Sequence, residues 1–339
     1  MKILFYDDPV FREHDAGEGH PERRARLDAL RNGIRDAGLE PHLDLRLPRP
    51  ASREELMRVH TAAHVDAVLA TEGRVRQFDP DTRAGPRSSA AALRAAGATV
   101  DAVERVLSSE STRAFCAVRP PGHHALPGSA MGFCLFNNVA VGAAHALSLG
   151  LERVLIVDFD VHHGNGTQEI FYGDSRVLYV SSHAYPFYPG TGATGEQGVG
   201  EGAGFTLNLP LPAGSGDAEY AAVYQGIVEP VARAFRPELV MVSAGFDAHA
   251  MDPLAEMRVS ELGFAAIARS CLAAAEGARG AVFVLEGGYA LPAIAASGAA
   301  VVRAMADEGE EPNIPTTPAG AALLAEFRAA FAPRWPALL

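Results

Sequence analysis

The chain has 339 residues, 48% of them hydrophobic, and 41 acidic against 29 basic residues give it a formal charge of −12. This length and composition suit one large α/β domain with a sizeable core, and they exclude a disordered or low-complexity chain. Proteins that bind nucleic acid usually present a basic face, so the acidic balance argues against such a partner. A cationic substrate would suit the charge, although many acidic proteins have none.

The cysteines and the N-terminus indicate a cytoplasmic protein. Cys116, Cys134 and Cys271 are odd in number and form no CxxC pair, which is typical of reduced thiols. The opening MKILFYDD is too short for the apolar part of a signal peptide and is predicted to be a strand. A membrane span needs about 18 consecutive apolar residues, and the sequence has no such run.

Strand-like and helix-like segments alternate along the whole chain, beginning in the first 150 residues. Proline in the first turn and glycine after the last turn mark the start and the end of the first helix. The expected elements are a strand at 2–6, a helix opened by His20-Pro21-Glu22 and ended by Gly38, a short helix with the capping box Ser52-x-x-Glu55, an alanine-rich helix at 88–107, a strand at 114–118 and a helix at 138–149.

The alternation of strands and helices continues from residue 150 onward. The strand RVLIVDFD at 153–160 begins with an uninterrupted apolar run, as buried strands of parallel sheets do. The other expected elements are strands at 177–181, 205–209, 239–244 and 281–285, and helices at 217–235, 260–276 and 291–306, the first two of them capped by Asp217 and Ser260. The alternation predicts one doubly wound sheet in a single domain over residues 1–339.

The segment 186–204 is rich in glycine and has no periodicity, which predicts a long ordered loop of a kind that is often functional. Gly190-x-Gly192-x-x-Gly195 matches the dinucleotide-binding pattern by letter. It follows Tyr188 instead of a strand, and no helix is expected after it, so we interpret these residues as loop glycines. The sequence also has no Walker loop, no GxSxG and no HExxH.

Titratable residues gather after four of the predicted strands. In open α/β sheets, ligands bind in the crevice outside the carboxyl ends of the strands, so these residues are expected to form one site. They are His123 and His124 after the strand at 114–118, Asp158, Asp160, His162 and His163 after RVLIV, Asp247 after LVMVSAGF, and Tyr289 after AVFVLEGG.

Asp160-x-His162 can hold a metal ion, because residues two apart in an extended segment point to the same side. Taken alone, such a pair is more often hydrogen bonded than metal bound. Asp247 at the end of another strand completes the three protein ligands of a catalytic zinc site with an open position. Two carboxylates neutralise the dication, so it acidifies water less than a three-histidine site does and needs a separate general base.

His123 and His124 follow Pro-Pro-Gly in a stiff loop and can supply that base. Each needs a partner on its other ring nitrogen, and Asp158 and Asn165 are the nearby polar candidates. A structural pair of hydrogen-bonded loop histidines is the alternative.

Tyr289 follows Glu286-Gly287-Gly288, whose glycines permit a tight turn close to a ligand. Its phenol can donate a hydrogen bond to a developing oxyanion. A tyrosine of the core is the alternative for this residue as well.

Six motifs occur together and in order, and with them the chain resembles the histone deacetylase superfamily, which includes bacterial histone deacetylase-like amidohydrolases and acetylpolyamine amidohydrolases. The resemblance extends over about residues 3–308. The motifs are RPPGHHA at 119–125, GFCLFNN at 132–138, DFDVHHGNGTQ at 158–168, SAGFD at 243–247, DPL at 252–254 and EGGY at 286–289. Asn165 stands where class I enzymes have aspartate, so the chain is similar to class II.

The resemblance implies a single-domain, three-layer arginase/deacetylase-type α/β fold with a mostly parallel sheet flanked by helices. It implies Zn²⁺, with Fe²⁺ as the alternative, on Asp160, His162 and Asp247. It implies that His124 acts as general base and then as general acid, that His123 is its electrostatic partner, and that Tyr289 polarises the scissile carbonyl. A structural K⁺ is implied at Asp158, Asp160, His162, Ser181 and Ser182, with Asn165 nearby.

The resemblance also implies the substrate-binding residues. Phe133 and Tyr188 would form two walls of the acyl-lysine channel, Asp81 would be a rim carboxylate, and Arg23 would line an inner acetate channel. Gly132, Leu254 and Gly288 complete this set.

Leu254 bears on the substrate, because polyamine specificity would place an acidic residue directly after Asp252-Pro253. The chain also lacks the long loop insertion of acetylpolyamine enzymes, and both features favour acyl-lysine or another small acylated amine. Glu256 lies near enough to keep acetylpolyamine as the alternative. A homo-oligomer is compatible with the resemblance.

Two other functions are less well supported. An arginase-like ureohydrolase needs ligands for two metals, but Gly164 follows DVHH, so the ligands of only one metal can be assembled. A non-catalytic deacetylase-like regulator would be expected to lack the histidines or the tyrosine, and all of them are present.

Overall fold

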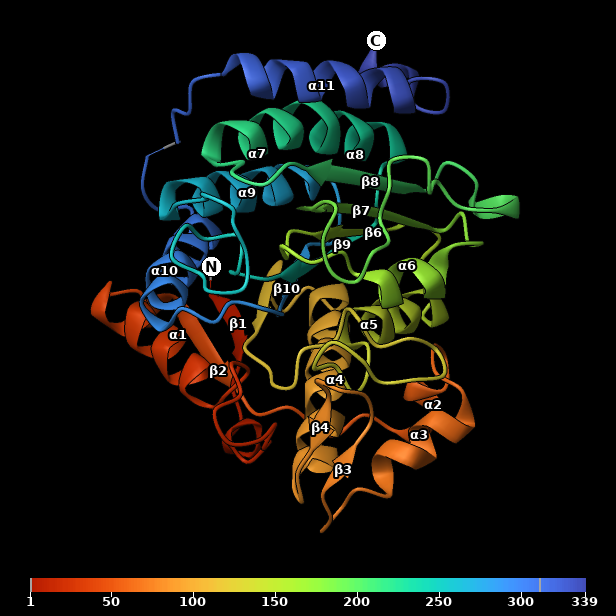
Figure 1. Ribbon diagram of the computed structural model, residues 1–339, viewed down its shortest axis with the longest axis vertical. Coiled ribbons are helices and arrows are strands. Elements are labelled where there is room, and N and C mark those ends of the chain that lie inside the picture. The colour runs from red at the N-terminus through yellow and green to blue at the C-terminus, as the bar shows by residue number, and fades with distance from the viewer. Residues whose placement is uncertain (1, 311) are drawn as a thin grey trace.

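The computed structural model describes residues 2–310 and 312–339 and contains an eight-stranded sheet in which every neighbouring pair is parallel (Figure 1). This confirms the predicted doubly wound α/β sheet. In spatial order the strands are β2 (Leu43–Arg46), β1 (Ile3–Tyr6), β5 (Arg113–Cys116), β10 (Ala281–Leu285), β9 (Leu239–Ala244), β6 (Val154–Asp158), β7 (Val177–Ala184) and β8 (Thr206–Leu211).

Helices cover both faces of the sheet and make three layers (Figure 1). One face is covered by α4 (Ser88–Leu107) and α5 (Asn138–Ser148). The other is covered by α1 (Ala25–Asp36), α7 (Asp217–Val223), α8 (Glu229–Phe235), α9 (Glu261–Ala274) and α10 (Leu291–Met305). Shorter elements are α2 (Arg53–Leu56), α3 (Ala62–Leu69), α6 (Asn165–Phe171) and a small hairpin of β3 (Arg76–Gln77) and β4 (Arg83–Ala84).

The sheet is the centre of the hydrophobic core. Every residue of β6, β9 and β10 is buried, as expected for strands covered on both faces by helices. At the β1–β5 pair, Phe5 stacks on Phe115 with ring centroids 5.6 Å apart. None of the helices within residues 2–310 and 312–339 is long and apolar enough to cross a membrane.

Two predicted helix starts are wrong. The first helix begins at Ala25 instead of at Pro21, because the Glu22 carboxylate turns inward to pair with Arg26 and Arg119. The cap of α7 is Gly216, and Asp217 is its first helical residue. The Asp217 carboxylate accepts hydrogen bonds from the backbone N–H and the hydroxyl of Ser260 instead, at 2.7 and 2.6 Å. The predicted capping box at Ser52 and the cap at Ser260 are confirmed.

The C-terminal segment forms an additional helix, α11 (Pro318–Phe331), which packs on α7. Figure 1 shows it as the outermost layer, at the top. After this helix, the Trp335 Nε1–H donates to the carbonyl of Gly204 at 2.9 Å, and its ring contacts Phe205 edge to face. The end of the chain therefore holds the distal end of the glycine-rich loop 186–204.

Two histidines are kept neutral by burial, and their ring nitrogens are hydrogen bonded inside the protein. His60 donates to the Leu126 carbonyl at 3.0 Å and accepts from the Asn137 N–H at 2.9 Å, while His183 lies between the Ser181 hydroxyl and the Gly192 carbonyl, 2.9 Å from each. Burial lowers the pKa of His60 to about 3, helped by the neighbouring His64, and burial lowers the pKa of His183 to about 4.

These shifts predict a loss of stability in mild acid. The unfolded chain takes up a proton on each histidine near pH 6.5, whereas the folded chain does not until about pH 3 to 4. The stabilisation is fully present above pH 6.5 and declines as the pH falls below it, by about 2 kcal/mol per histidine at pH 5. Urea unfolding of the unaltered protein at pH 7 and pH 5 measures this loss.

The variant His60→Gln should reduce the difference in unfolding free energy between the two pH values by about 2 kcal/mol, because it removes the contribution of one buried neutral histidine. His42→Gln, which changes a histidine near the surface, is the control and should keep the full difference. A difference in His60→Gln as large as that of the unaltered protein would contradict the prediction.

Candidate active site

Four adjacent strands bring the predicted site residues together. β5, β10, β9 and β6 are consecutive in the sheet, and the loops after their carboxyl ends carry the residues in question. His123 and His124 follow β5, Tyr289 follows β10, Asp247 follows β9, and Asp158, Asp160 and His162 lie at or just after the end of β6. All seven are at most slightly exposed, so the site is a buried polar cluster at the edge of an apolar core.

The predicted metal ligands converge. His162 Nδ1 lies 3.2 Å from Asp160 Oδ1 and 3.2 Å from Asp247 Oδ2, and the three potential ligand atoms are all within 4.8 Å of one another. Glycine lines the cradle around them, because a Cβ on Gly245 would lie 2.1 Å from Asp160 Oδ2 and a Cβ on Gly287 would lie 2.1 Å from Asp247 Oδ2.

The chemistry of this donor set fits a zinc ion. Burial and the nearby charge of Asp160 raise the pKa of Asp247 to about 6, so two ionised carboxylates are unfavourable here without a cation. One imidazole and two carboxylates are ligands that Zn²⁺ accepts, with a further position left for water or substrate.

A second cluster of potential ligands is already neutralised. Glu55, Glu104 and His145 also bring their ligand atoms within 4.8 Å of one another. Arg49 pairs with both glutamates at 2.6 and 3.2 Å, and Arg58 Nη1 lies 2.6 Å from His145 Nδ1. We therefore interpret this cluster as an ion-pair network.

Each of the adjacent histidines has the partner that the sequence suggested for the pair. His123 Nδ1 lies 3.0 Å from Asp158 Oδ2, and His124 Nδ1 lies 2.8 Å from Asn165 Oδ1. Burial alone would lower the pKa of His123, but the charges of Asp158 and Asp160 outweigh it and raise that pKa to about 10. Burial and the neighbouring His123 hold the pKa of His124 well below its usual value.

These opposite shifts separate the roles that the two rings can perform. A charged His123 can act only as an electrostatic partner, whereas a neutral His124 can accept a proton. The Nδ1 of His124 donates to the amide oxygen of Asn165, which leaves its Nε2 free to take up that proton.

A tight turn places Tyr289. Gly288 has a φ of +112°, which favours glycine, and the Gly287 N–H donates to Asp160 Oδ2 at 2.7 Å. The Tyr289 N–H donates to Asp252 Oδ2 at 2.6 Å, and the Tyr289 ring meets Phe133 edge to face at 5.9 Å. The turn is therefore anchored to a predicted metal ligand on one side and to Asp252 on the other.

The arginine beside Tyr289 is Arg26, whereas Arg23, which was predicted to line an inner acetate channel, lies apart from it. Arg23 is exposed and borders a separate hollow near Arg119. Arg26 is completely buried because it lies on the inward face of α1, and its Nε–H donates to the Gly288 carbonyl at 2.6 Å. Its guanidinium lies 5.1 Å from the centre of the Tyr289 ring.

Two carboxylates of the site were missed as functional residues. Glu286 Oε2 accepts hydrogen bonds from the N–H groups of Gly122 and His123 at 2.6 and 3.1 Å, which fixes the histidine loop. Asp252 holds the turn before Tyr289, as described above, and also accepts from the Leu254 N–H at 3.0 Å. Both residues belong to sequence motifs, EGGY and DPL, and membership of these motifs is the feature that could have indicated their roles.

The predicted substrate residues surround a pocket of about 90 Å³. Phe133 and Tyr188 both line it, and the Tyr188 ring meets His124 edge to face at 5.2 Å. Gly132 has a φ of +55°, and a Cβ there would lie 2.4 Å from the His124 ring. The complete lining is Asp81, Pro121, His123, His124, Gly132, Phe133, His162, Tyr188, Leu254, Gly287 and Tyr289. Gly288 is not part of this lining and contributes through the turn.

The two predicted serines, Ser181 and Ser182, lie on β7 behind the predicted metal ligands. Ser182 Oγ lies 3.5 Å from the Asp158 carbonyl oxygen and 2.9 Å from the Tyr224 hydroxyl, while Ser181 Oγ lies 2.9 Å from His183 Nδ1. This is a polar layer beneath the site, and its use for K⁺ stays a prediction.

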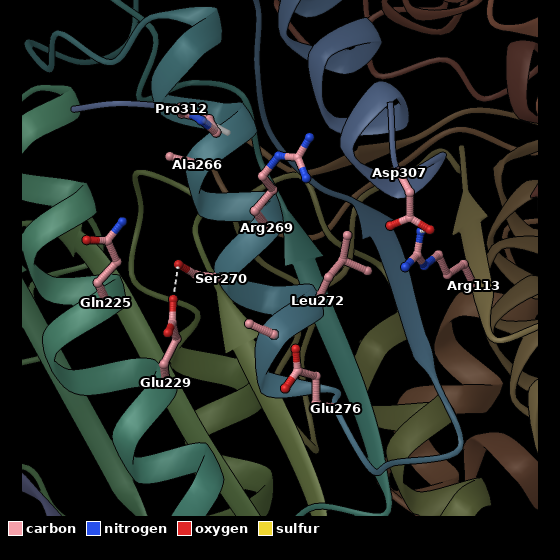
Figure 2. Close-up of a pocket in the computed structure, with 11 residues that line it drawn as sticks. Arg113, Gln225, Glu229, Ala266, Arg269, Ser270, Leu272, Glu276, Asp307 and Pro312 are labelled. Atoms are coloured by element: carbon pink, nitrogen blue, oxygen red, sulfur yellow. Dashed lines mark hydrogen bonds and ion pairs between the residues drawn. The ribbon is translucent and has the colours of Figure 1, made fainter. Parts of the chain in front are cut away.

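A separate hollow of about 290 Å³ lies beside α9 (Figure 2). Four of its polar groups form two pairs: the Ser270 hydroxyl donates to Glu229 at 2.7 Å, and Arg113 pairs with Asp307 at 2.7 Å. Because Arg113 begins β5, this hollow lies toward the amino ends of the strands, away from the candidate active site.

Comparisons with known proteins agree with this geometry. The histone deacetylase domain family matches residues 20–305. A probable deacetylase of Archaeoglobus fulgidus is 41% identical over 295 residues, which cover 85% of this chain and 81% of that protein. A histone deacetylase-like amidohydrolase of Pseudomonas aeruginosa is 41% identical over 296 residues, covering 85% and 77%. The crystal structure of the HDA15 HD domain superposes with a TM-score of 0.92 at 38% identity, over 99% of this chain and 96% of that one. The chain therefore belongs to the histone deacetylase family of deacetylases and amidohydrolases.

Proposed function

We propose that the protein is a zinc-dependent amidohydrolase that removes an acetyl or related small acyl group from the side-chain nitrogen of lysine. The observation that carries this proposal is that a neutral His124, Tyr289 and His162 line one pocket of about 90 Å³. The ligand atoms of Asp160 and Asp247 lie within 4.8 Å of that of His162. A pocket of this size suits a small acyl group and its amide.

Asp160, His162 and Asp247 would hold Zn²⁺, or Fe²⁺ in its place, and the bound ion would supply Lewis-acid chemistry at the amide carbonyl. His124 takes a proton from the attacking water at Nε2 and later gives it to the departing amine nitrogen. The Tyr289 hydroxyl donates a hydrogen bond to the oxygen on which negative charge develops. We further propose a structural K⁺ at Asp158, Asp160, His162, Ser181 and Ser182.

The walls of the pocket favour an acylated lysine. Phe133, Tyr188 and Leu254 offer apolar surface to the methylene stem of a lysine side chain, and Asp81 lies among them as a polar group. A protein with three buried free cysteines suits the reducing cytoplasm, where we propose that it acts.

Acetylpolyamine is the second candidate substrate, since Glu256 follows Leu254 closely and is exposed. Side-by-side kcat/KM values for acetyl-lysine peptides and acetylpolyamines decide between the two substrates. A strong preference for acetylpolyamines would reject acyl-lysine.

Metal removal tests the chemistry. Protein treated with a chelator should lose hydrolysis of acetyl-lysine peptides and regain it with one Zn²⁺ per chain, measured by elemental analysis. Asp247→Asn should lose both metal and turnover, because it replaces one of the two carboxylates among the three predicted ligands with a neutral amide. Glu104→Gln is the control, since it changes a carboxylate of the arginine-neutralised cluster and should keep both.

Each remaining outcome contradicts the proposal in a different way. Two Mn²⁺ ions per chain together with release of urea would indicate a ureohydrolase. Zinc binding without turnover of any acylated amine would indicate a binding protein.

A further inference from the structure

An apolar groove adjoins the mouth of the catalytic pocket. Its volume is about 560 Å³, and it is lined mainly by the end of β7 and the following residues, by the turn after β8, and by the segment after Asp252. The side chains that give it its character are Pro186, Phe187, Pro212, Pro253, Leu254 and Met257. Glu256 is the one charged residue of this lining.

The groove is continuous with the catalytic pocket. Leu254 lines both. Phe187, in the groove, stacks on the ring of His162 with centroids 5.3 Å apart, and the next residue, Tyr188, lines the catalytic pocket. The remainder of a substrate whose acyl group occupies the pocket therefore extends past Leu254, at the rim of the groove.

The walls of the groove are fixed before a substrate binds. The Gly214 N–H donates to the Glu256 carbonyl at 2.9 Å, which ties the turn after β8 to the segment after Asp252. The Leu254 N–H donates to Asp252 Oδ1, and Asp252 Oδ2 holds the Tyr289 turn. A preformed apolar surface costs little ordering entropy when it binds a ligand.

We infer that this groove is a substrate subsite that takes a large apolar side chain, aliphatic or aromatic, within two residues of the acylated lysine. The inference rests on the proposed function and extends it from the scissile bond to the surrounding peptide. An extended backbone advances about 3.3 Å per residue, so side chains one or two positions from the lysine reach a groove that begins at Leu254. The prolines and Phe187 offer apolar contact, and Glu256 disfavours an acidic neighbour.

A series of blocked pentapeptides with a central acetyl-lysine tests the inference on the zinc-loaded protein. Serine occupies all four flanking positions in the reference peptide, and each position is replaced in turn by leucine, phenylalanine or aspartate. Leucine or phenylalanine at one of these positions should raise kcat/KM about tenfold over serine. Aspartate at that position should lower kcat/KM below the serine value.

Variants of the groove provide the second arm. Ala213 is exposed on the groove wall, so Ala213→Trp fills the groove and should bring the leucine-to-serine ratio close to one. Ala213→Arg adds a cation near Glu256 and should favour the aspartate peptide over the leucine peptide. Leu149→Trp is the matched control, because Leu149 is 52% exposed at the end of α5, outside the groove, and this variant should keep the ratio of the unaltered protein.

The outcomes separate the subsite from the proposed function. Hydrolysis of all peptides at equal kcat/KM would overturn the subsite and leave the deacylase function standing. Failure to hydrolyse any acetyl-lysine peptide would overturn both. A dimer in size-exclusion chromatography that Ala213→Trp dissociates, with the peptide ratio unchanged, would assign the groove to a second copy of the chain and would also overturn the subsite.

Discussion

Replacing Tyr289 with phenylalanine is expected to lower kcat for deacylation by a factor of about 10² to 10³ while zinc content and folding stay unchanged. Burial raises the pKa of the Tyr289 phenol well above its usual value, so the hydroxyl keeps its proton and can donate it in a hydrogen bond. Phenylalanine keeps the ring packing against Phe133 and Arg26 and removes only this donor. The loss should therefore appear in turnover instead of in stability.

Steady-state kinetics with an acetyl-lysine peptide, together with elemental analysis of zinc, measure this effect. Tyr220→Phe is a matched control, because Tyr220 is also buried and its hydroxyl has no hydrogen-bond partner among residues 2–310 and 312–339. Activity of Tyr289→Phe near that of the unaltered protein would remove Tyr289 from the mechanism.

Replacing Arg26 with methionine should destabilise the protein by about 3 to 5 kcal/mol, the usual cost of removing one partner from a buried ion pair. The buried carboxylate of Glu22 would keep its ion pair with Arg119 but lose the one with Arg26. The carbonyl of Gly288 would lose its hydrogen-bond donor. Because that carbonyl belongs to the turn before Tyr289, kcat should fall as well, since small displacements of a catalytic group are costly.

Urea unfolding at pH 7 and peptide deacetylation measure the two effects of the Arg26 substitution. Arg23→Met is the control, because it makes the same chemical change three residues earlier at an exposed position. Its unfolding free energy should stay within about 0.5 kcal/mol of the unaltered protein. Equal stability of the two variants would show that Arg26 is not an essential counter-charge.

The strands that carry the site could be predicted from the sequence because they are buried on both faces. Such strands read as uninterrupted apolar runs, as in residues 154–157 and 281–285, and polar residues directly after them are conspicuous. The carboxyl ends of parallel strands meet at one edge of the sheet, so Asp160, Asp247 and Tyr289 could be placed together before any coordinates were known.

Elements that depend on distant contacts could not be predicted in this way. β2 lies at the edge of the sheet, and its LDLR segment is only partly buried, so it has no apolar run. α1 begins late because Glu22 is drawn to Arg119, which is 97 residues away in the sequence. Local propensity contains no information about such a partner.

The sequence does contain a signal for the burial of Arg26. Arg26 is four residues before Leu30 and eight before Ile34, so it lies on the apolar stripe of α1, whereas Arg23 precedes the helix. A charged residue on an inward stripe must find a buried partner, and Glu22, one turn earlier, was the nearest candidate.

The position of β1 also affects how the limits of this protein should be drawn. The family match begins at residue 20, yet β1 occupies residues 3–6 and pairs with β2 on one side and β5 on the other. The segment before the family match therefore supplies an interior strand of the sheet. The unit by which relatives are recognised is smaller than the unit that folds, and a fragment for expression should be chosen by the strand pairing and not by the extent of the family match.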